Sequence, residues 1–139
     1  MIEAYKRFFR NYVNFEGRAN RAEYWWVVLC NVIIYLVCIF LGLMIAGFQG
    51  DEITANLVFS MGIGIILMWI YGLATIIPSI SLTVRRLHDI NLSGWLCLLG
   101  LIPYIGGLIV FIMTLIKGTE GENKYGEPST FDAESNIAN

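Results

Sequence analysis

The chain has little charge for its length. Only 14% of its 139 residues are charged and 57% are hydrophobic, whereas a soluble domain has about 25% charged residues. It has a single histidine and a net charge of −2. The chain therefore lacks the excess of basic residues that would indicate binding to nucleic acid. The composition therefore excludes an ordinary soluble domain and predicts an integral membrane protein whose main partner is the lipid bilayer.

Ionisable residues are missing from three long stretches, which cover residues 24–50, 53–84 and 90–116. About 20 apolar residues in a helix cross the roughly 30 Å hydrocarbon core. Helices satisfy all their own backbone donors and acceptors, which lipid cannot do. The sequence therefore predicts an all-α polytopic membrane protein with three transmembrane helices. The first begins after Asn20, whose side chain can cap it, with Glu23 as the capping-box partner.

The third stretch contains Pro103 at its middle, and a proline removes a backbone donor and kinks a helix. Two structures are compatible with this. One is a kinked helix that spans the membrane completely, and we favour it. The other is a re-entrant hairpin that runs from Trp95 to Ile102 and back from Tyr104 to Ile116, which would return the C-terminal tail to the cytoplasm.

Both flanks of the helical region have a distinct character. Residues 2–15 predict a short amphipathic helix that either rests on the membrane surface or packs on the protein's own spans. Residues 118–139 are acidic and contain little apolar surface, so we expect a largely flexible tail, mobile beyond Pro128. The predicted organisation is a helical membrane domain, 1–117, and this tail, 118–139. The apolar face of the amphipathic helix carries Tyr5, Phe8, Phe9, Tyr12 and Val13.

Lysine and arginine are distributed unevenly between the two sides of the predicted membrane domain. Five precede the first span, none follows it, two follow the second span, and Lys117 and Lys124 follow the third. Cytoplasmic segments carry the excess of these residues. With three spans, this places seven of them inside and two outside, so we expect a cytoplasmic N-terminus in a bacterial inner membrane.

Two polar segments flank the spans and would meet at this cytoplasmic surface. Guanidinium groups bind phosphate or carboxylate in a planar, bidentate way, so the arginines predict a site for anionic lipid headgroups or for a protein partner. Alternatively, internal pairs such as Arg86 with Asp89, or Arg18 with Glu23, use up these charges. The candidate binding residues are Arg18, Arg21, Arg85, Arg86, His88 and Asp89.

Other functions are less well supported by the residues. A small oligomeric channel or transporter for a weakly polar solute would use the uncharged polar residues of the spans. A lipid-headgroup enzyme would use His88 and Asp89, but no nucleophile accompanies them at a recognisable spacing. The three cysteines fit no metal motif, so we expect no cofactor, no metal and no enzymatic activity. The residues considered for transport are Asn31, Asn56, Thr75 and Ser79.

Pairs of small residues four apart are typical of close helix contacts in membranes. Gly42 with Ala46 and Ser60 with Gly64 form two such pairs. We expect one of them to lie at the interface of a homo-oligomer.

Three motifs resemble those of a known family. They are the segments 15–25 (FEGRANRAEYW), 84–95 (VRRLHDINLSGW) and 118–126 (GTEGENKYG), and nearly the whole chain is similar to the small bacterial inner-membrane family known as domain of unknown function eight hundred and five. The resemblance implies an inner-membrane location and a multi-span helical fold, and it implies no reaction. Asn91 stands where glycine is common in the middle motif.

Overall fold

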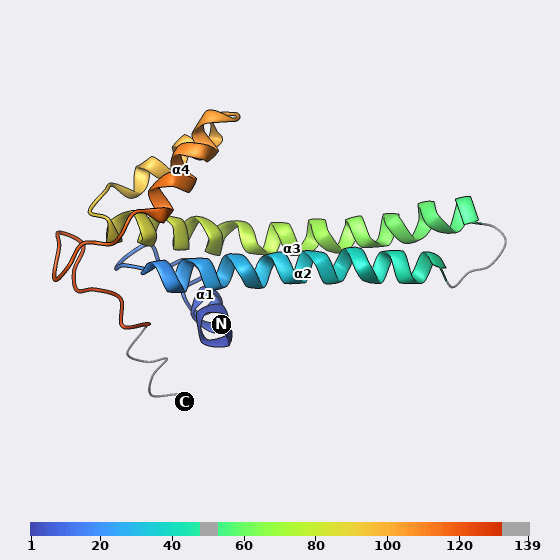
Figure 1. Cartoon of the computed structure of the whole chain (residues 1–139), viewed down its shortest axis with the longest axis horizontal. Coiled ribbons are helices and arrows are strands. Elements are labelled where there is room, and N and C mark those ends of the chain that lie inside the picture. The colour runs from blue at the N-terminus through green and yellow to red at the C-terminus, as the bar shows by residue number, and fades with distance from the viewer. Residues whose placement is uncertain (48–52, 132–139) are drawn as a thin grey trace. The chain divides into compact units, whose positions relative to one another are not determined.

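The chain is all-helical in the computed structural model, which describes residues 1–47 and 53–131, with the side chains of 46–47 and 53–61 outside that description (Figure 1). The predicted connection between the first two spans falls largely within 48–52, outside the described residues. The elements are α1 (Ile2–Arg10), α2 (Arg21–Gly47), α3 (Ile53–Asp89), the 3₁₀ helix η1 (Gly94–Leu101) and α4 (Ile105–Leu115).

Two helices are long and apolar enough to cross a membrane, over Arg21–Ile45 and Gly62–Asp89. They correspond to the first two predicted spans. The second continues as helix through Pro78 to Asp89, beyond the uncharged stretch that ends at residue 84. The segment predicted as the connection after span two is therefore the last part of α3, where Arg86 and Asp89, three residues apart, share a helical face and form an ion pair.

The chain divides into two compact units, one formed by residues 1–28 and 77–139 and the other by residues 29–76. We refer to them as unit 1 and unit 2. Unit 2 contains the last part of α2 and the first part of α3. A Cβ atom added to Gly64 would lie 3.8 Å from the carbonyl oxygen of Cys38 and 4.0 Å from the Cα atom of Gly42. Gly42 and Gly64 thus pack α2 against α3 within one chain, and the homo-oligomer stays a prediction.

Unit 1 contains the amphipathic helix, which ends at Arg10 and so is shorter than predicted. Its inner face packs on the protein, because Ala4 and Phe8 are fully buried in a cluster that includes Val27, Leu82 and Phe131. Phe9, from the same predicted apolar face, remains exposed. The helix therefore packs on the protein along one face and leaves apolar side chains uncovered on another.

The third apolar stretch is not the kinked span that the sequence led us to favour. It forms η1 and α4, which pack against each other as a hairpin (yellow to orange in Figure 1). The turn follows Pro103, and Tyr104 adopts a φ of 64°. Gly106 allows the return, because an added Cβ would lie 1.7 Å from the carbonyl oxygen of Leu99. The hairpin alternative is thus the one that the structure shows.

The tail also differs from the expectation of a largely flexible segment. Up to residue 131 it packs within unit 1: Phe131 is 3% exposed, and the hydroxyl of Thr130 accepts a hydrogen bond from Arg7 at 2.8 Å. Expectations for residues 132–139 lie outside the described residues. Gly118 lies beyond α4, which ends at Leu115, and is close to the Asp89 carboxylate.

Because the hairpin brings the tail back to the unit that contains the N-terminus, both termini are expected on the same side of the membrane. A fluorescent reporter that matures only in the cytoplasm should be active when fused before Met1 or after Asn139. An alkaline phosphatase fusion after Asn139, which is active only outside the cytoplasm, should be inactive. Phosphatase activity at that position would instead indicate a third helix that crosses the membrane completely.

Candidate functional site

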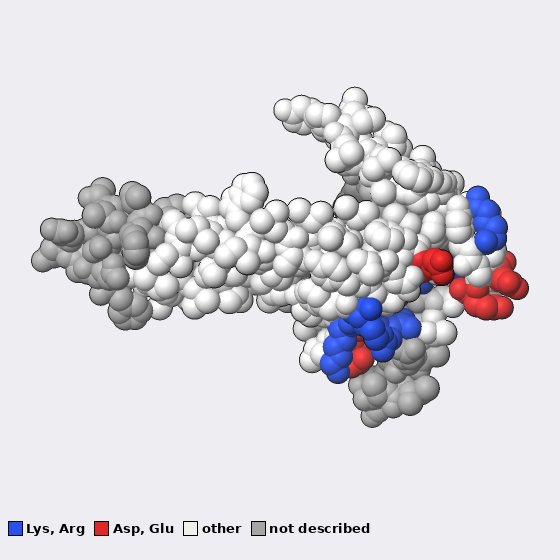
Figure 2. Space-filling model, turned by 180° about the vertical axis from the view of Figure 1, so that it is seen from behind, with Lys and Arg blue, Asp and Glu red and all other residues white. Residues whose placement is uncertain are grey.

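The polar motifs meet in unit 1, where four arginines surround two carboxylates. All charged residues that the structure describes belong to this unit, and those on the face shown in Figure 2 lie close together. The four arginines and two carboxylates form two triads, each with a carboxylate between two arginines. We call them the Asp89 triad (Arg18, Asp89, Arg86) and the Glu23 triad (Arg7, Glu23, Arg85).

In the Asp89 triad, one carboxylate holds two buried guanidinium groups. Arg18 donates from Nε to Oδ1 of Asp89 at 3.0 Å, and Arg86 donates from Nη1 to Oδ2. The three residues are between 0% and 6% exposed. A charge buried this deeply is tolerated only when it is paired and its remaining donors are hydrogen-bonded.

The remaining donors of the Asp89 triad bind backbone carbonyls of the hairpin exit and the tail. Arg18 donates to the carbonyl oxygens of Thr119 at 2.5 Å and Gly121 at 2.6 Å. Arg86 donates to those of Thr114, at 3.2 Å, and Ile116. A Cβ on Gly118 would lie 2.1 Å from Oδ2 of Asp89, so only glycine allows the tail to pass this close.

In the Glu23 triad, the carboxylate of α2 meets arginines from α1 and α3. Oε1 of Glu23 lies 3.3 Å from Nη1 of Arg85, and Oε2 lies 3.5 Å from Nη1 of Arg7. The hydroxyl of Ser129 donates to Oε2 at 3.0 Å. Asn20 caps α2 as predicted, accepting from the amide of Glu23 at 2.8 Å, but the carboxylate of Glu23 pairs with arginines.

The triads contain more positive than negative charge, since four arginines oppose two carboxylates. Nε and Nη2 of Arg85 are buried without a hydrogen-bond partner among the residues that the structure describes. The cluster is therefore under-neutralised as well as buried, which makes each carboxylate more important for stability.

His88 and Asp89 face different partners although they are adjacent. The His88 ring stacks on Tyr125 with the ring centroids 3.8 Å apart, and Nδ1 lies 3.3 Å from the carbonyl oxygen of Gly17. Asn123 donates to the carbonyl of His88 at 3.0 Å. Asn91 has a φ of 61°, the left-handed conformation that glycine adopts readily and asparagine tolerates, so this turn accepts either residue.

The structure brings together most of the predicted site residues but turns them inward. Arg18, Arg85, Arg86 and Asp89 are buried and mutually paired, His88 is partly buried, and only Arg21 is exposed. The predicted pair of Arg86 with Asp89 is confirmed, and that of Arg18 with Glu23 is wrong because Arg18 binds Asp89. Most of these charges therefore form ion pairs inside the protein, which was the alternative to headgroup binding in the sequence analysis.

Three contributions to this site were missed from the sequence. The candidate residues do not include Arg7, the sequence predicts only a capping-box role for Glu23, and the tail carbonyls belong to a segment expected to be flexible. One signal was available for Glu23: it is a carboxylate in the first turn of an apolar helix, where a charge needs an opposite charge nearby. No comparable signal exists for backbone carbonyls, which every residue carries.

Two of the polar residues considered for transport, Asn31 and Thr75, are hydrogen-bonded within unit 2. The hydroxyl of Tyr71 donates to Oδ1 of Asn31, and that of Thr75 donates to the carbonyl of Tyr71 at 2.9 Å. The Ser79 carbonyl accepts from Thr83, and the side chain of Asn56 lies outside the described residues. Within residues 1–47 and 53–131, no three His, Cys, Asp or Glu side chains lie close enough to share a metal ion.

The long apolar helices and the buried charge cluster at their polar ends define a multi-pass membrane protein. The family profile described as protein of unknown function (DUF805) matches residues 12–127, and the chain belongs to this family. It is 39% identical to the inner membrane protein YhaH of Escherichia coli over 129 residues, which cover 90% of this chain and 94% of that protein. It is 36% identical to the E. coli inner membrane protein YhaI over 130 residues, covering 94% and 98%.

No solved structure matches the chain. The relatives and the two apolar helices show an inner membrane protein with transmembrane helices. The resemblance recognised in the three motifs is thereby confirmed.

Proposed function

We propose that the protein is a non-enzymatic binding module of the inner membrane, with its N-terminus in the cytoplasm. The two triads form its rigid frame, and the outer face of α1 binds anionic lipid headgroups. The observation that carries this proposal is that α1 is fixed to the frame by its inner face while Lys6 and Arg10 remain exposed on another face.

Three faces of α1 support the proposal. Ala4 and Phe8 are buried and hold the helix in place. Lys6 and Arg10 are four residues apart, so they share a second face, and both are exposed. Phe9 is 39% exposed on a third face. A helix in the membrane interface has this arrangement, with apolar residues toward the acyl chains and cations at the headgroups.

The buried arginines stabilise the frame and are poorly placed to bind lipid. The guanidinium groups of Arg18 and Arg86 already donate to Asp89 and to backbone carbonyls, so a lipid phosphate would have to break these bonds. Asp89 is likewise bound to arginines and does not orient the His88 ring, which supports a non-enzymatic role for this pair.

On α1 itself, Lys6 is paired with Glu3 at 2.8 Å. This hydrogen bond lowers the pKa of Glu3 below its ordinary value. Both groups are exposed, so the pair is weak in water, and a lipid phosphate can replace the carboxylate. Arg10 adds a second exposed cation one turn further along the helix.

The test is the lipid selectivity of the reconstituted protein, measured by the association of spin-labelled phosphatidylglycerol relative to phosphatidylcholine. We expect the double variant Lys6→Gln/Arg10→Gln to lower this selectivity about five-fold or more, because each cation near an anionic surface contributes roughly 1 kcal/mol. The difference should shrink at high salt.

The matched control is Lys117→Gln/Lys124→Gln, which also removes two exposed cations, from a tail segment that contains three glutamates. This variant should retain the selectivity of the unmodified protein. Equal losses in the two variants would indicate a response to net charge alone and would overturn the role of α1. Selectivity that survives in the α1 variant would do the same.

A further inference from the structure

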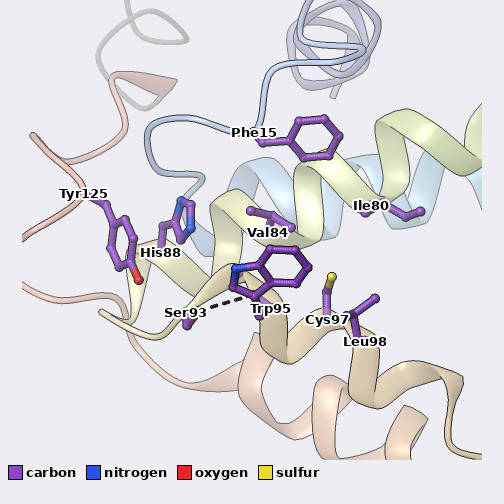
Figure 3. Close-up of a pocket in the computed structure, with 10 residues that line it drawn as sticks. Phe15, Ile80, Val84, His88, Ser93, Trp95, Cys97, Leu98 and Tyr125 are labelled. Carbon is purple, nitrogen blue, oxygen red and sulfur yellow. Dashed lines mark hydrogen bonds between the residues drawn. The ribbon is translucent and has the colours of Figure 1, made fainter.

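A cavity of about 470 Å³ lies in unit 1, between α3 and η1 (Figure 3). Ile80, Val84 and His88 line it from α3, and since they are spaced four apart they share one face of that helix. Trp95 and Leu98 line it from η1. The cavity is separate from the two triads and from the outer face of α1.

The two ends of the cavity differ in chemistry. His88 and Tyr125 close one end with their stacked rings, and Ile80, Cys97 and Leu98 form the other (Figure 3). At the apolar end, Ile80 is 44% exposed and Leu98 is 51% exposed. In a protein of the inner membrane, such side chains face hydrocarbon, so the cavity changes from polar to apolar along α3.

At the polar end of the cavity, Gly94 of η1 lies directly against side chains of α3. A Cβ added to Gly94 would lie 2.6 Å from Cγ1 of Val84 and 3.1 Å from Nε2 of His88. Glycine therefore lets η1 start directly on α3, and the two helices line the open space beyond. Since Gly94 belongs to the wall itself, the cavity is a built feature of the hairpin.

Water is a poor occupant of this space. A buried water needs two to four polar partners, and most of the lining side chains are apolar. The hydroxyl of Ser93 is already the acceptor for the amide of Trp95 at 3.4 Å. An apolar occupant is favoured, because its transfer from water or its packing against these side chains releases free energy.

The cavity has the size of a small-molecule site. Its volume of about 470 Å³ lies in the range of roughly 300–1,000 Å³ that such sites have. A single extended hydrocarbon chain is narrow enough to enter.

We propose that this cavity binds one acyl chain of a membrane phospholipid, with the ester end of the chain beside His88 and Tyr125. The chain enters from the hydrocarbon between Ile80 and Leu98 and packs along Val84 and Trp95. His88 and Tyr125 supply polar groups where the chain joins its glycerol ester. This site is independent of the headgroup binding proposed for α1.

The test uses the full chain reconstituted with phosphatidylethanolamine that carries a diazirine in the middle of one acyl chain. After illumination, labelled peptides are identified by mass spectrometry. We expect labelling to be concentrated on residues 80–84 and 95–98. Exposed apolar residues of α4, such as Leu108 and Ile112, report the background from lipid that merely surrounds the protein.

Cys97→Trp fills the cavity and should lower labelling of its walls about ten-fold or more, the loss that about 1.4 kcal/mol of binding free energy represents. Leu101→Trp is the matched control, because Leu101 is on the same helix, 79% exposed, and outside the lining. Ile80→Trp fills the cavity from α3 and is the second cavity-filling variant, to be used if Cys97→Trp does not fold.

Even labelling of the cavity walls and α4, or equal labelling of the filled and control variants, would overturn the proposal. Phosphatidylglycerol with the same diazirine should label the same residues, because the chain and not the headgroup is recognised. Lys6→Gln/Arg10→Gln should leave the labelling unchanged, so failure of the acyl-chain site and failure of headgroup binding at α1 are distinguishable.

Discussion

Asp89→Asn is expected to lower the free energy of unfolding by about 3–5 kcal/mol, the cost of leaving buried charges without their partner. Asparagine has nearly the same shape as aspartate but no charge, so Arg18 and Arg86 would remain buried without a counter-charge. Arg18 and Arg86 also hold the hairpin exit and the tail through carbonyl hydrogen bonds. Loss of Asp89 should therefore loosen these segments together. Denaturation of the purified protein in mixed micelles measures the change.

The control for this variant is Glu120→Gln. Glu120 also pairs with a cation three residues away, Lys117 at 2.6 Å, but both side chains are more than 70% exposed. Pairs in water contribute about 0–1 kcal/mol, so this change should have almost no effect. If Asp89→Asn were as mild as Glu120→Gln, the Asp89 triad could not be the frame of unit 1.

Gly106→Ala is expected to open the hairpin, whereas Gly107→Ala should be neutral or slightly stabilising. A Cβ on Gly106 would lie 1.7 Å from the carbonyl oxygen of Leu99 and 2.9 Å from Cβ of Ile102, and neither atom is the flexible end of a side chain. Overpacking typically costs 1–3 kcal/mol, and a clash with backbone belongs at the upper end, so we expect about 3 kcal/mol.

Gly107 offers a matched control because it is the adjacent residue of the same helix. Nothing lies within 4 Å of a Cβ added there, and alanine favours a helix by up to about 1 kcal/mol over glycine. Thermal unfolding in detergent and proteolysis of the tail measure both variants. Similar unfolding temperatures for the two would mean that η1 and α4 do not meet as the structure shows.

The closed triads change how the positive flanks of this protein are interpreted. Lysine and arginine near membrane spans set the orientation of many membrane proteins, and a cluster of arginines in such a flank also predicts headgroup binding. In this chain Arg18, Arg85 and Arg86 are internal counter-charges for Glu23 and Asp89. Lys6 and Arg10 of α1 remain exposed, and the proposed lipid contact therefore shifts to that helix.

Much of the fold could be predicted from local pattern. Runs without charge located α2 and α3, because apolar length is a property of consecutive residues. The cap at Asn20 followed from the same kind of local reasoning. The end of α3 differs from the prediction, because the charged residues beyond the apolar run continue the helix and pair with Glu23, Asp89 and Arg18.

The candidate site was predictable only in part, since its membership depends on distance in space. Arg18 and Asp89 are 71 residues apart in the chain, and no local pattern specifies that they pair. The sequence did bring the right motifs under consideration, because charged residues at the ends of apolar spans are few. It could not tell whether those charges point outward to lipid or inward to each other.

The amino-acid sequence alone determined that the protein lies in a membrane and where its two long helices are. Both properties depend on hydrophobicity along a continuous segment. Its family was also recognisable in three short motifs. The tertiary structure decided the rest: that the third apolar run turns back at Pro103, that the tail joins the N-terminal unit, and that the arginines are buried. These features depend on contacts between distant segments, such as Gly106 with Leu99 and Asp89 with Arg18, which a linear pattern does not contain.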